Sequence, residues 1–550
     1  MPTAAPWLAH YDPGVPATLE PYSNRTLIEY LADAARDRPQ APALLFKGAT
    51  LSYSALDRLS DACAAAFAAL GVSRGDRVGL LLPNCPQFFI AEFGAWKLGA
   101  IVAPLNPIYT EHEIEAAVTD SGVTTMVTLS RFYQRVKNIQ HATGVRRVIS
   151  TNIKEFFPPL LRVLFTLFRE TRDGDRIRLR PGDHDFAHLL LVNRARKPAV
   201  PVPTTKDPAV LLMSGGTTGN PKGVLGSHGA YAIAGMQIKA WHASTLHGTG
   251  DVTFLPLPLF HVYGNVGVQA LTFMIGAAIA IVPNPRDLPD LLATIKRVKP
   301  TFFAGVPTLY VAMLNHPLVK QGKIDFSSIR ICFSGASALL ADTKTRFESL
   351  TGARIVEGYS LTEAMMAACV NPVKGPHCSV AGAPEAWWDQ SACLGVPPPA
   401  FSTGGIGAGC QASHAPRAIA ASAITIKSPC GDAPEVDVNS QIPTPTSAPA
   451  SARIAMAMNT WSSRPSRLHF GCRYSITAPL ASAPRLRLAS AMNMPPRTHS
   501  IVTAARPRAD QNTMMNKIIV AAARYRRCGS RHSRPFPFPA LTEVPPMGTS

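Results

Sequence analysis

The feature that most constrains the fold is an alternation of amphipathic helical segments with short apolar runs over roughly the first 380 residues. Apolar residues recur at three- and four-residue steps over 56–70, and Gly71 follows where helices commonly end. The run 77–82 then predicts a buried strand, 88–98 predicts a second helix, and 100–103 predicts the next strand. This alternation predicts an α/β fold of layered β-sheets flanked by helices.

The same pattern continues after a less regular middle section. The further expected strands are 209–213, 277–282, 301–304 and 329–333, and the further expected helices are 289–298 and 341–350. A chain of 550 residues is too long for one hydrophobic core, since single cores stop growing near ~250–300 residues. We therefore expect residues 1–385 to form one large domain made of several subdomains.

The pattern stops beyond about Pro384, and 386–550 is rich in Ala, Pro, Ser and Arg without sustained periodicity. This segment carries 17 basic and 6 acidic side chains, and 15 of the basic ones are arginines. Such a composition is typical of a GC-rich reading frame translated out of register, so we interpret the segment as the product of a frameshift near 375–386. The alternative is a genuine disordered tail, against which the adjacent Trp387 and Trp388 count. In either case we expect this third of the chain to be irregular or disordered.

Charge and cysteine usage limit the partners and the compartment. More than half of the net charge of +19 lies in 386–550, so the large domain offers little reason to expect a nucleic-acid partner, although the arginine-rich tail keeps nucleic-acid binding as a competing hypothesis. The ten cysteines form no CxxC or Cys/His zinc pattern, which favours a reducing compartment. The first residues show no basic segment followed by an apolar one, so we expect a cytoplasmic protein without a signal peptide.

Two segments raise the question of membrane contact. The stretch 252–285 lacks charged residues, but prolines and polar residues interrupt it, and its longest clean run, 271–282, is shorter than the ~20 residues of a span. We expect a buried helix and strand there. The segment 156–172 places large apolar residues around Arg162 and Arg169, as in helices that dock on membrane surfaces. A surface helix that covers the protein's own core has the same composition, so peripheral contact with the inner face of the membrane stays open.

The strongest local signal is a run of small and hydroxyl residues that follows the expected strand 209–213. Backbone N–H groups, the serine and threonine hydroxyls and a lysine ammonium can together hold a polyphosphate. The Walker pattern is not met, because Gly223 rather than Ser or Thr follows the lysine. The candidate nucleotide-binding residues of this run are Ser214, Gly215, Gly216, Thr217, Thr218, Gly219 and Lys222.

This run resembles the signature phosphate loop of the adenylate-forming superfamily, to which acyl-CoA synthetases belong. Three further segments are similar to motifs of that superfamily and occur in the same order: 255–264, which contains His261, 334–336 and 357–363. The resemblance covers about residues 1–380. It implies an N-terminal domain of the acyl-adenylate-forming type.

The resemblance also implies roles for single residues. Gly335 and Ala336 would form the turn that contacts adenine, with Gly358 and Tyr359 beside it and the aromatic ring stacked on the base. Thr362 would contact the AMP phosphate, and Glu363 would help to hold Mg²⁺. The candidate catalytic residues are Lys222, His261, Thr362 and Glu363.

Local alternatives exist for each of these motifs. The histidine of 255–264 would border the acyl pocket, but a lone histidine in an apolar setting is more often a packed core residue. Small residues at 334–336 would also suit a tight connection between a strand and a helix. Ser360 and Glu363 have the spacing of a capped helix start.

The implied reaction has two halves: a carboxylate attacks ATP to give an acyl-adenylate and pyrophosphate, and coenzyme A then takes the acyl group. Segments 75–87 and 99–107 resemble acyl-CoA ligases, so long-chain fatty acids are the expected acyl substrates, with ATP, Mg²⁺ and coenzyme A. Nothing in the sequence indicates an oligomeric state.

Motifs that the superfamily carries further along its chain are not found in 364–550. No Thr-Gly-Asp occurs there, and neither Lys427 nor Lys517 lies in a Gly-Lys turn. We therefore expect a fatty acyl-CoA ligase whose activity is impaired. A catalytically inactive protein that binds nucleotide or acyl groups is the alternative.

Overall fold

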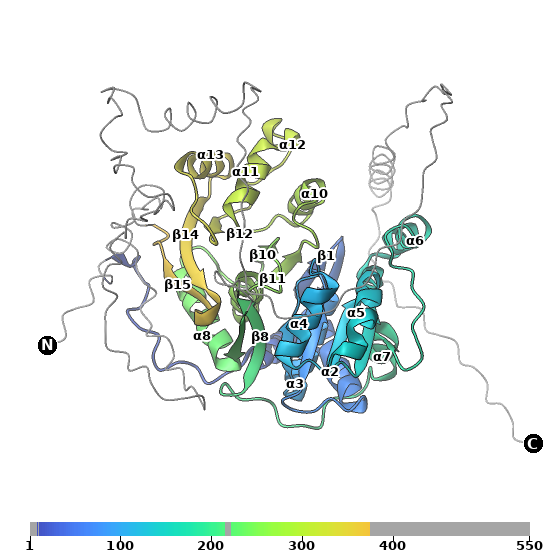
Figure 1. The fold of residues 1–550 in the computed structure, drawn as a ribbon. Coiled ribbons are helices and arrows are strands. Elements are labelled where there is room, and N and C mark those ends of the chain that lie inside the picture. The colour runs from blue at the N-terminus through green and yellow to red at the C-terminus, as the bar shows by residue number, and fades with distance from the viewer. Residues whose placement is uncertain (1–7, 9, 215–221, 375–550) are drawn as a thin grey trace, which may run out of the picture. The chain divides into compact units, whose positions relative to one another are not determined.

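The computed structural model describes residues 8, 10–214 and 222–374, which build two β-sheets with helices packed on them (Figure 1). The expected tail, 386–550, lies outside the described residues, as do Gly215, Gly216, Thr217, Thr218 and Gly219 of the phosphate run.

The first sheet has eight strands and is parallel except for an antiparallel hairpin at each of its two edges. In sheet order its strands are β15 (Met366–Val370), β14 (Arg354–Leu361), β13 (Ile331–Ser334), β12 (Phe302–Gly305), β10 (Val252–Leu255), β11 (Ala278–Ile281), β1 (Pro42–Phe46) and β2 (Ala49–Ser52). The first strand of the chain therefore pairs with a strand more than two hundred residues later, Leu44 lying opposite Ile279.

The second sheet has seven strands, and only its β8–β9 pair is antiparallel. In sheet order its strands are β7 (His184–Asp185), β6 (Arg147–Thr151), β5 (Thr125–Leu129), β3 (Arg77–Leu81), β4 (Ile101–Pro104), β8 (Pro208–Ser214) and β9 (Lys222–Ser227). The hairpin at the edge carries the two ends of the phosphate run, Ser214 opposite Lys222.

Helices connect the strands and cover the sheets. The α-helices are α1 (Leu27–Asp37), α2 (Tyr53–Ala69), α3 (Pro86–Leu98), α4 (Glu111–Ser121), α5 (Tyr133–Ile139), α6 (Pro159–Phe168), α7 (Phe186–Val192), α8 (His228–Trp241), α9 (Gln269–Ile275), α10 (Leu288–Val298), α11 (Pro307–Asn315), α12 (Pro317–Lys320) and α13 (Ala341–Thr351). Four 3₁₀ turns, η2 (Ser130–Phe132), η3 (Gln140–Ala142), η4 (Ile153–Phe156) and η6 (Thr362–Ala364), and one π-helix, η5 (Tyr263–Val268), complete the described elements.

Local sequence explains where several helices begin and end. Helix α2 begins after Ser52, whose hydroxyl accepts a hydrogen bond from the N–H of Ala55. Helix α3 has Pro86 at its first position, where the missing N–H costs nothing, and ends at Gly99 with φ +79°. These caps fix the lengths of the two helices that pack between the sheets.

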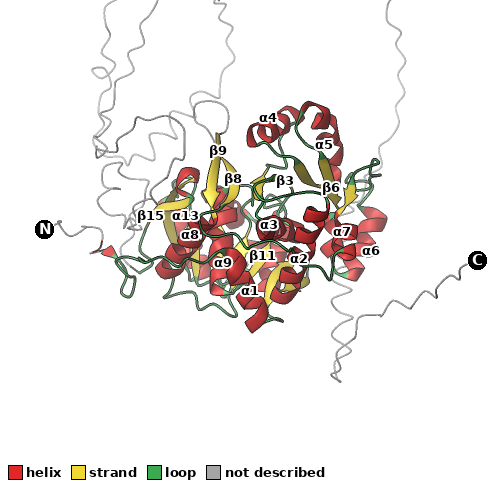
Figure 2. Cartoon of the chain, turned by 90° about the horizontal axis from the view of Figure 1, so that it is seen from below, coloured by secondary structure: helices red, strands yellow, loops and turns green. Residues whose placement is uncertain are grey.

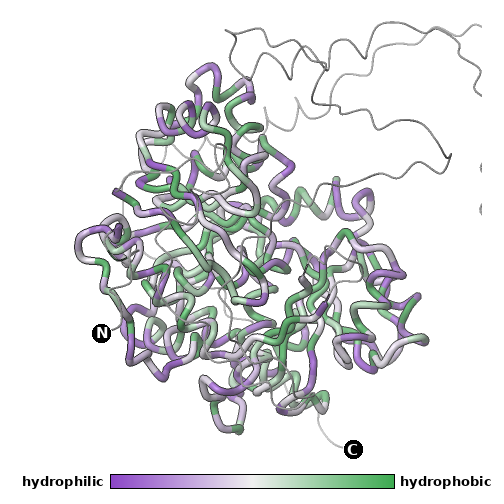
Figure 3. The backbone as a smooth tube through the Cα atoms, turned by 60° about the vertical axis from the view of Figure 1, so that its left-hand side comes forward, coloured by the Kyte–Doolittle hydropathy of each residue, from purple (hydrophilic) through white to green (hydrophobic). Residues whose placement is uncertain are grey.

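Alternating residues of the strands divide the interior into three apolar clusters. Phe303 of β12 faces α10, α11 and α13, whereas its neighbour Phe302 faces the central layer that contains α2, α3, α8 and α9. Met126 of β5 faces α4 and α5 on the far side of the second sheet. The result is an α–β–α–β–α layering, in which α1, α2 and α9 lie close together (Figure 2) and apolar residues concentrate along the strands (Figure 3).

The predicted α/β layering is confirmed, and the predicted helices and strands are found with shifts of a few residues at their ends. The apolar stretch 252–285 forms β10, the π-helix, α9 and β11, all of which are largely buried, as expected. Across the part of the chain that the structure describes, no helix combines the length and apolar character that crossing a bilayer requires.

Candidate functional site

The site is built at the carboxyl ends of three adjacent parallel strands. Gly305 at the end of β12 pairs with Ser334 at the end of β13, and Ser334 pairs with Glu357 of β14. In open α/β sheets, ligands bind where parallel strands end and the chain leaves the sheet. The predicted motifs 334–336 and 357–363 leave the sheet side by side at this edge.

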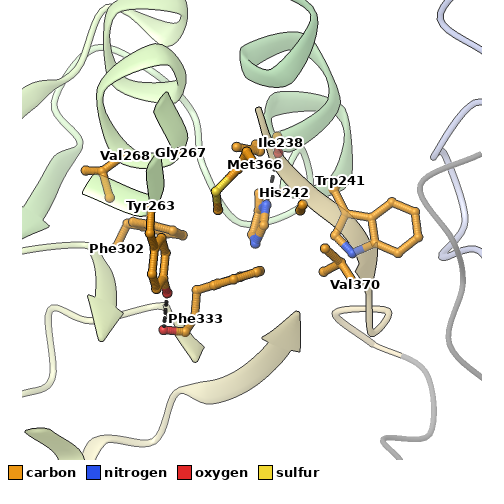
Figure 4. Close-up of a pocket in the computed structure, with 11 residues that line it drawn as sticks. Ile238, Trp241, His242, Tyr263, Gly267, Val268, Phe302, Phe333, Met366 and Val370 are labelled. Atoms are coloured by element: carbon orange, nitrogen blue, oxygen red, sulfur yellow. Dashed lines mark hydrogen bonds between the residues drawn. The ribbon is translucent and has the colours of Figure 1, made fainter. Parts of the chain in front are cut away.

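Tyr263, the first residue of the π-helix, closes this edge from one side. Its hydroxyl lies 2.9 Å from the carbonyl oxygen of Phe333 and 3.2 Å from that of Gly305, and it donates its proton between them (Figure 4). The hydroxyl of Tyr310 donates to the same Phe333 oxygen at 2.8 Å. Two buried phenols therefore hold the end of β13 in place.

Two glycines leave a narrow space beside the tyrosine. A Cβ atom on Gly335 would lie 3.4 Å from the carbonyl oxygen of Gly358 and 3.5 Å from the ring of Tyr263. A Cβ atom on Gly358 would lie only 2.4 Å from the ring of Phe333, so no side chain fits there. Ala336 follows with a φ of +70° and is exposed. The structure thus brings the backbones of Gly335 and Gly358 close together, with Ala336 directly after Gly335.

The rest of the 357–363 motif continues out of the sheet edge. Tyr359 is 47% exposed, Thr362 is buried at the start of η6, and Glu363 is exposed. The strand runs to Leu361 and a 3₁₀ turn follows it, so the alternative of a capped helix start at Ser360 is wrong.

The hairpin of the phosphate run lies against this turn. Met365, just after η6, fills the space beside Gly226 of β9, where a Cβ atom would lie 2.3 Å from the methionine Cε. Strand β8 also contacts η6. Ser214 is buried and Lys222 is exposed, and they face each other across the mouth of the hairpin. The two motifs that are most specific in the sequence are therefore neighbours in space.

Two polar atoms at the strand ends have no hydrogen-bond partner among the described residues: the hydroxyl of Ser334 and Oε1 of Glu357. Glu357 accepts only a long bond, 3.4 Å, from the N–H of Leu339 at its other oxygen, and burial raises the pKa of its carboxyl group. Unpaired buried polar atoms are costly, so these two are suited to a polar ligand. The sequence does not predict these two unpaired atoms, because only the register of β13 and β14 places Ser334 opposite Glu357.

His261 lies two residues before Tyr263 and is exposed. Its Nδ1 accepts a hydrogen bond from the N–H of Tyr263 at 3.3 Å, and desolvation by the surrounding atoms lowers its pKa. It does not line the pocket described next, so its predicted place at the acyl pocket stays a prediction.

An apolar pocket lies directly behind Tyr263 and extends away from the strand ends (Figure 4). Helix α8, the π-helix, β12, β13 and β15 contribute to its walls. Its free volume is small, about 20 Å³. The lining residues are Ile238, Trp241, His242, Tyr263, Gly267, Val268, Phe302, Phe333, Met366, Ala367 and Val370.

The polar groups at this edge of the sheet bear on which metal ion and nucleotide could bind there. Among the described residues, no cluster of three or more His, Cys, Asp or Glu side chains that could hold a metal ion is present. Mg²⁺ in nucleotide sites commonly takes one or two carboxylates together with phosphate oxygens, so the exposed carboxylate of Glu363 fits that ion. The glycine gap and the orphaned hydroxyl of Ser334 fit a nucleoside.

Comparison with known proteins agrees with this geometry. The family of AMP-binding enzymes matches residues 31–397, and the chain belongs to that family. A long-chain-fatty-acid–CoA ligase of Bacillus subtilis (strain 168) is 34% identical over 367 residues, which are 66% of this chain and 64% of the relative. The chain therefore spans slightly less than two thirds of that relative's length.

Solved structures share the fold. A long-chain-fatty-acid–CoA ligase from Archaeoglobus fulgidus aligns with a TM-score of 0.55 at 21% identity, covering 66% of this chain and 69% of that one. An anthranilate CoA ligase in complex with anthranoyl-AMP gives a TM-score of 0.55 at 23% identity, covering 65% and 63%. These likenesses confirm the expected fold of layered β-sheets flanked by helices.

Proposed function

We propose that this chain is an ATP-dependent fatty acyl-CoA ligase. It would join a carboxylate to ATP to give an acyl-adenylate and pyrophosphate, and then pass the acyl group to coenzyme A. The observation that carries the proposal is a convergence: the β8–β9 hairpin, the gap between Gly335 and Gly358, and the Thr362 turn meet at one sheet edge, with an apolar pocket behind Tyr263. The charged nucleotide and the apolar acid would then meet at the side chain of Tyr263.

In this proposal each group has a role that suits its chemistry. Ser214 and Lys222 hold the phosphates from the hairpin, Thr362 donates to the α-phosphate, and Tyr359 covers the adenine that lies along the glycines. Glu363 holds Mg²⁺, which when bound offsets phosphate charge. His261 borders the entrance through which the carboxylic acid reaches the acyl pocket. Ser334 and Glu357 add polar partners that the sequence did not single out.

The nucleotide site can be tested by binding. Thr362→Val removes a buried hydroxyl and keeps the shape, and we expect ATP affinity, measured by calorimetry, to fall about 10- to 150-fold, since a hydrogen bond to a charged group contributes about 1.5–3 kcal/mol. Thr351→Val is the matched control, because that threonine is equally buried and bonds within α13 to Phe347. Equal affinity of the two variants would contradict the assignment of Thr362.

We propose further that turnover is impaired, because 364–550 contains neither a Thr-Gly-Asp nor a lysine in a Gly-Lys turn. With full-length protein, ATP, Mg²⁺, coenzyme A and hexadecanoic acid, we expect acyl-CoA formation at least ~100-fold slower than by the Bacillus relative, the scale of losing one charge-stabilising group. Formation at the relative's rate would refute impairment. Binding of ATP without any release of pyrophosphate would favour the inactive, nucleotide-binding alternative.

The origin of residues 386–550 has its own test. We propose that they are read from a shifted frame and stand in place of the rest of the N-terminal domain and a small C-terminal domain. Sequencing the gene across codons 370–390 should show a single-base insertion or deletion whose repair restores a frame encoding Thr-Gly-Asp. An intact open frame in independent isolates would refute this origin.

Helix α6 supports a further part of the proposal: a cytoplasmic protein that touches the inner face of the membrane. Its apolar side chains Leu160, Val163, Leu167 and Phe168 are 60%, 55%, 69% and 63% exposed. Arg162 is exposed on the same helix and can meet anionic headgroups. Phe165 of α6 packs against the hydrophobic core, so the helix covers the core only in part.

Vesicle binding tests this contact. We expect the protein to co-sediment with vesicles containing phosphatidylglycerol, and expect Leu167→Glu combined with Phe168→Glu to reduce the bound fraction at least about tenfold, since two apolar side chains leave the interface. Leu340→Glu is the matched control, because Leu340 is 63% exposed and lies between β13 and α13. Loss of binding in both variants, or in neither, would contradict a role of α6.

A further inference from the structure

The apolar pocket is lined by one histidine, His242. It follows the last residue of α8 and is 1% exposed. Its Nδ1 lies 2.9 Å from the carbonyl oxygen of Ile238. Because a carbonyl oxygen can only accept, Nδ1 carries the proton, and Nε2 is left with a lone pair. Figure 4 shows the ring reaching into the space between Tyr263, Phe333 and Val370.

That lone pair has no partner among the described residues. The rings of Phe302 and Phe333 flank the imidazole at 5.6 and 6.1 Å and have no polar hydrogen to offer. The nearby donors are already used: the Tyr263 hydroxyl donates to backbone oxygens, and Trp241 Nε1 donates to the Asn371 carbonyl at 2.9 Å. Burial lowers the pKa of His242 to about 4, so the ring stays neutral and Nε2 stays an acceptor near pH 7.

An acceptor in this position discriminates between ligands. The free space of about 20 Å³ takes roughly one water, which can donate to Nε2. An unsubstituted acyl chain that enters the pocket expels the water and leaves Nε2 unpaired, whereas a hydroxyl on the chain replaces the water's hydrogen bond. Sites with a buried polar group reject an analogue that lacks the matching donor.

The pocket can lengthen where it is now closed. The Met366 side chain fills the space beside Gly267, at which a Cβ atom would lie 2.6 Å from the methionine Cε. A methionine side chain has three rotatable bonds and can turn aside at low cost. A chain that displaces it passes His242 on the way.

We propose that His242 is a specificity residue of this pocket and that the preferred acyl substrate is a hydroxylated carboxylic acid whose hydroxyl donates to Nε2. The inference rests on the proposed acyl-CoA ligase function, because that function assigns the pocket to the acyl group. It adds the chemical class of the substrate. His242 does not touch the reacting carboxylate and takes no part in the transfer.

The test measures binding and needs no turnover. Full-length protein is titrated with hexadecanoic acid and with a series of its monohydroxylated isomers, by displacement of a fluorescent fatty-acid probe. We expect at least one isomer to bind about 5- to 150-fold more tightly than the unsubstituted acid, the range for leaving a buried polar atom unpaired. His242→Phe should abolish this preference and tighten binding of the unsubstituted acid, whereas His242→Gln, which keeps an acceptor, should retain part of it.

The outcomes separate the two proposals. If the acids bind and no isomer is preferred, or if the His242→Phe protein keeps the preference, the role of His242 is refuted while the ligase proposal stands. If ATP binds but no acid competes with the probe, the acyl pocket and the proposal built on it both fail. The comparison of ligands on the unaltered protein needs no variant, so a variant that does not fold leaves the test decisive.

Discussion

A buried carboxyl group beneath the π-helix gives the sharpest prediction on stability. Glu92 of α3 is fully buried, and Asn265 and Gln269 lie 2.9 and 2.6 Å from its two oxygens. Desolvation raises its pKa from 4.5 to about 7. Both amide nitrogens donate to the Glu92 oxygens, and these hydrogen bonds offset part of the cost of burying the carboxyl group.

The sign of the pH effect follows from this shift. Between pH 4.5 and about 7 the folded state holds the Glu92 proton and the unfolded state has lost it, so stability falls as the pH rises through this window and is level above it. The rise of the Glu92 pKa from 4.5 to about 7 corresponds to about 3 kcal/mol. Glu92→Gln is isosteric and neutral, and it removes this term.

The assay is thermal unfolding of wild type and Glu92→Gln at pH 5 and pH 8. For a folded unit of roughly 365 residues the unfolding entropy is about 0.8 kcal/mol per kelvin, so the variant's melting temperature relative to wild type should rise by about 4 °C between the two pH values. Burial lowers the pKa of His228 and His242 to about 4, so these two residues make the stability of the folded state rise with pH. The variant contains both residues as well, so their effect cancels in the difference between variant and wild type.

A matched variant sharpens this measurement. Glu155, near β6, is only half-buried, but its pKa is also raised to about 7, so Glu155→Gln should show a difference of the same sign and the double variant the sum of the two. A Glu92→Gln protein whose melting temperature runs parallel to wild type from pH 5 to pH 8 would refute the reasoning.

Two further substitutions test packing and charge. Gly358→Ala should lower the free energy of unfolding by about 1–3 kcal/mol and weaken ATP binding, since its Cβ would lie 2.4 Å from the Phe333 ring. Urea titration measures the first effect and calorimetry the second. Unchanged values of both would contradict the tight packing at Gly358. Lys97→Met should lower the free energy of unfolding by about 3–5 kcal/mol in the same urea titration, because the buried ammonium contacts Asp57 and Asp61 at 2.6 and 2.7 Å and its loss leaves their charges unpaired. A loss below about 1 kcal/mol would show that water reaches the two carboxylates.

The elements of the fold were predictable because their signals are local. The periodic apolar residues of α2, the αL glycine after α3 and the apolar run of β8 all lie within the segments they define. The hairpin β14–β15 was missed, since 354–361 contains the small and polar residues of the binding motif rather than an alternating pattern.

The candidate site was predictable only where a motif carries it. Gly335, Gly358 and Thr362 were named as candidates by resemblance, and the structure brings Gly335 and Gly358 close together. The partners that complete the site were not identified, because each depends on contacts between distant segments: Tyr263 with Phe333, and Ser334 with Glu357 across two strands. His242 gives no sequence signal at all, since only the surrounding pocket makes its lone pair unusual.

The carboxylate of Asp12 links the beginning of this domain to its end. It accepts hydrogen bonds from the N–H groups of Val373, at 2.6 Å, and Lys374, at 3.0 Å. Together with the pairing of β1 and β11, this contact means that the earliest segments made on the ribosome wait for partners made hundreds of residues later. During synthesis, α1 can pack on α2 and β1 can pair with β2 soon after they emerge, whereas the other edge of β1 stays unpaired until β11 has been made. A reading frame that was lost before residue 373 would remove both of these hydrogen bonds, which tie the segment around Asp12 to the strand end beyond β15.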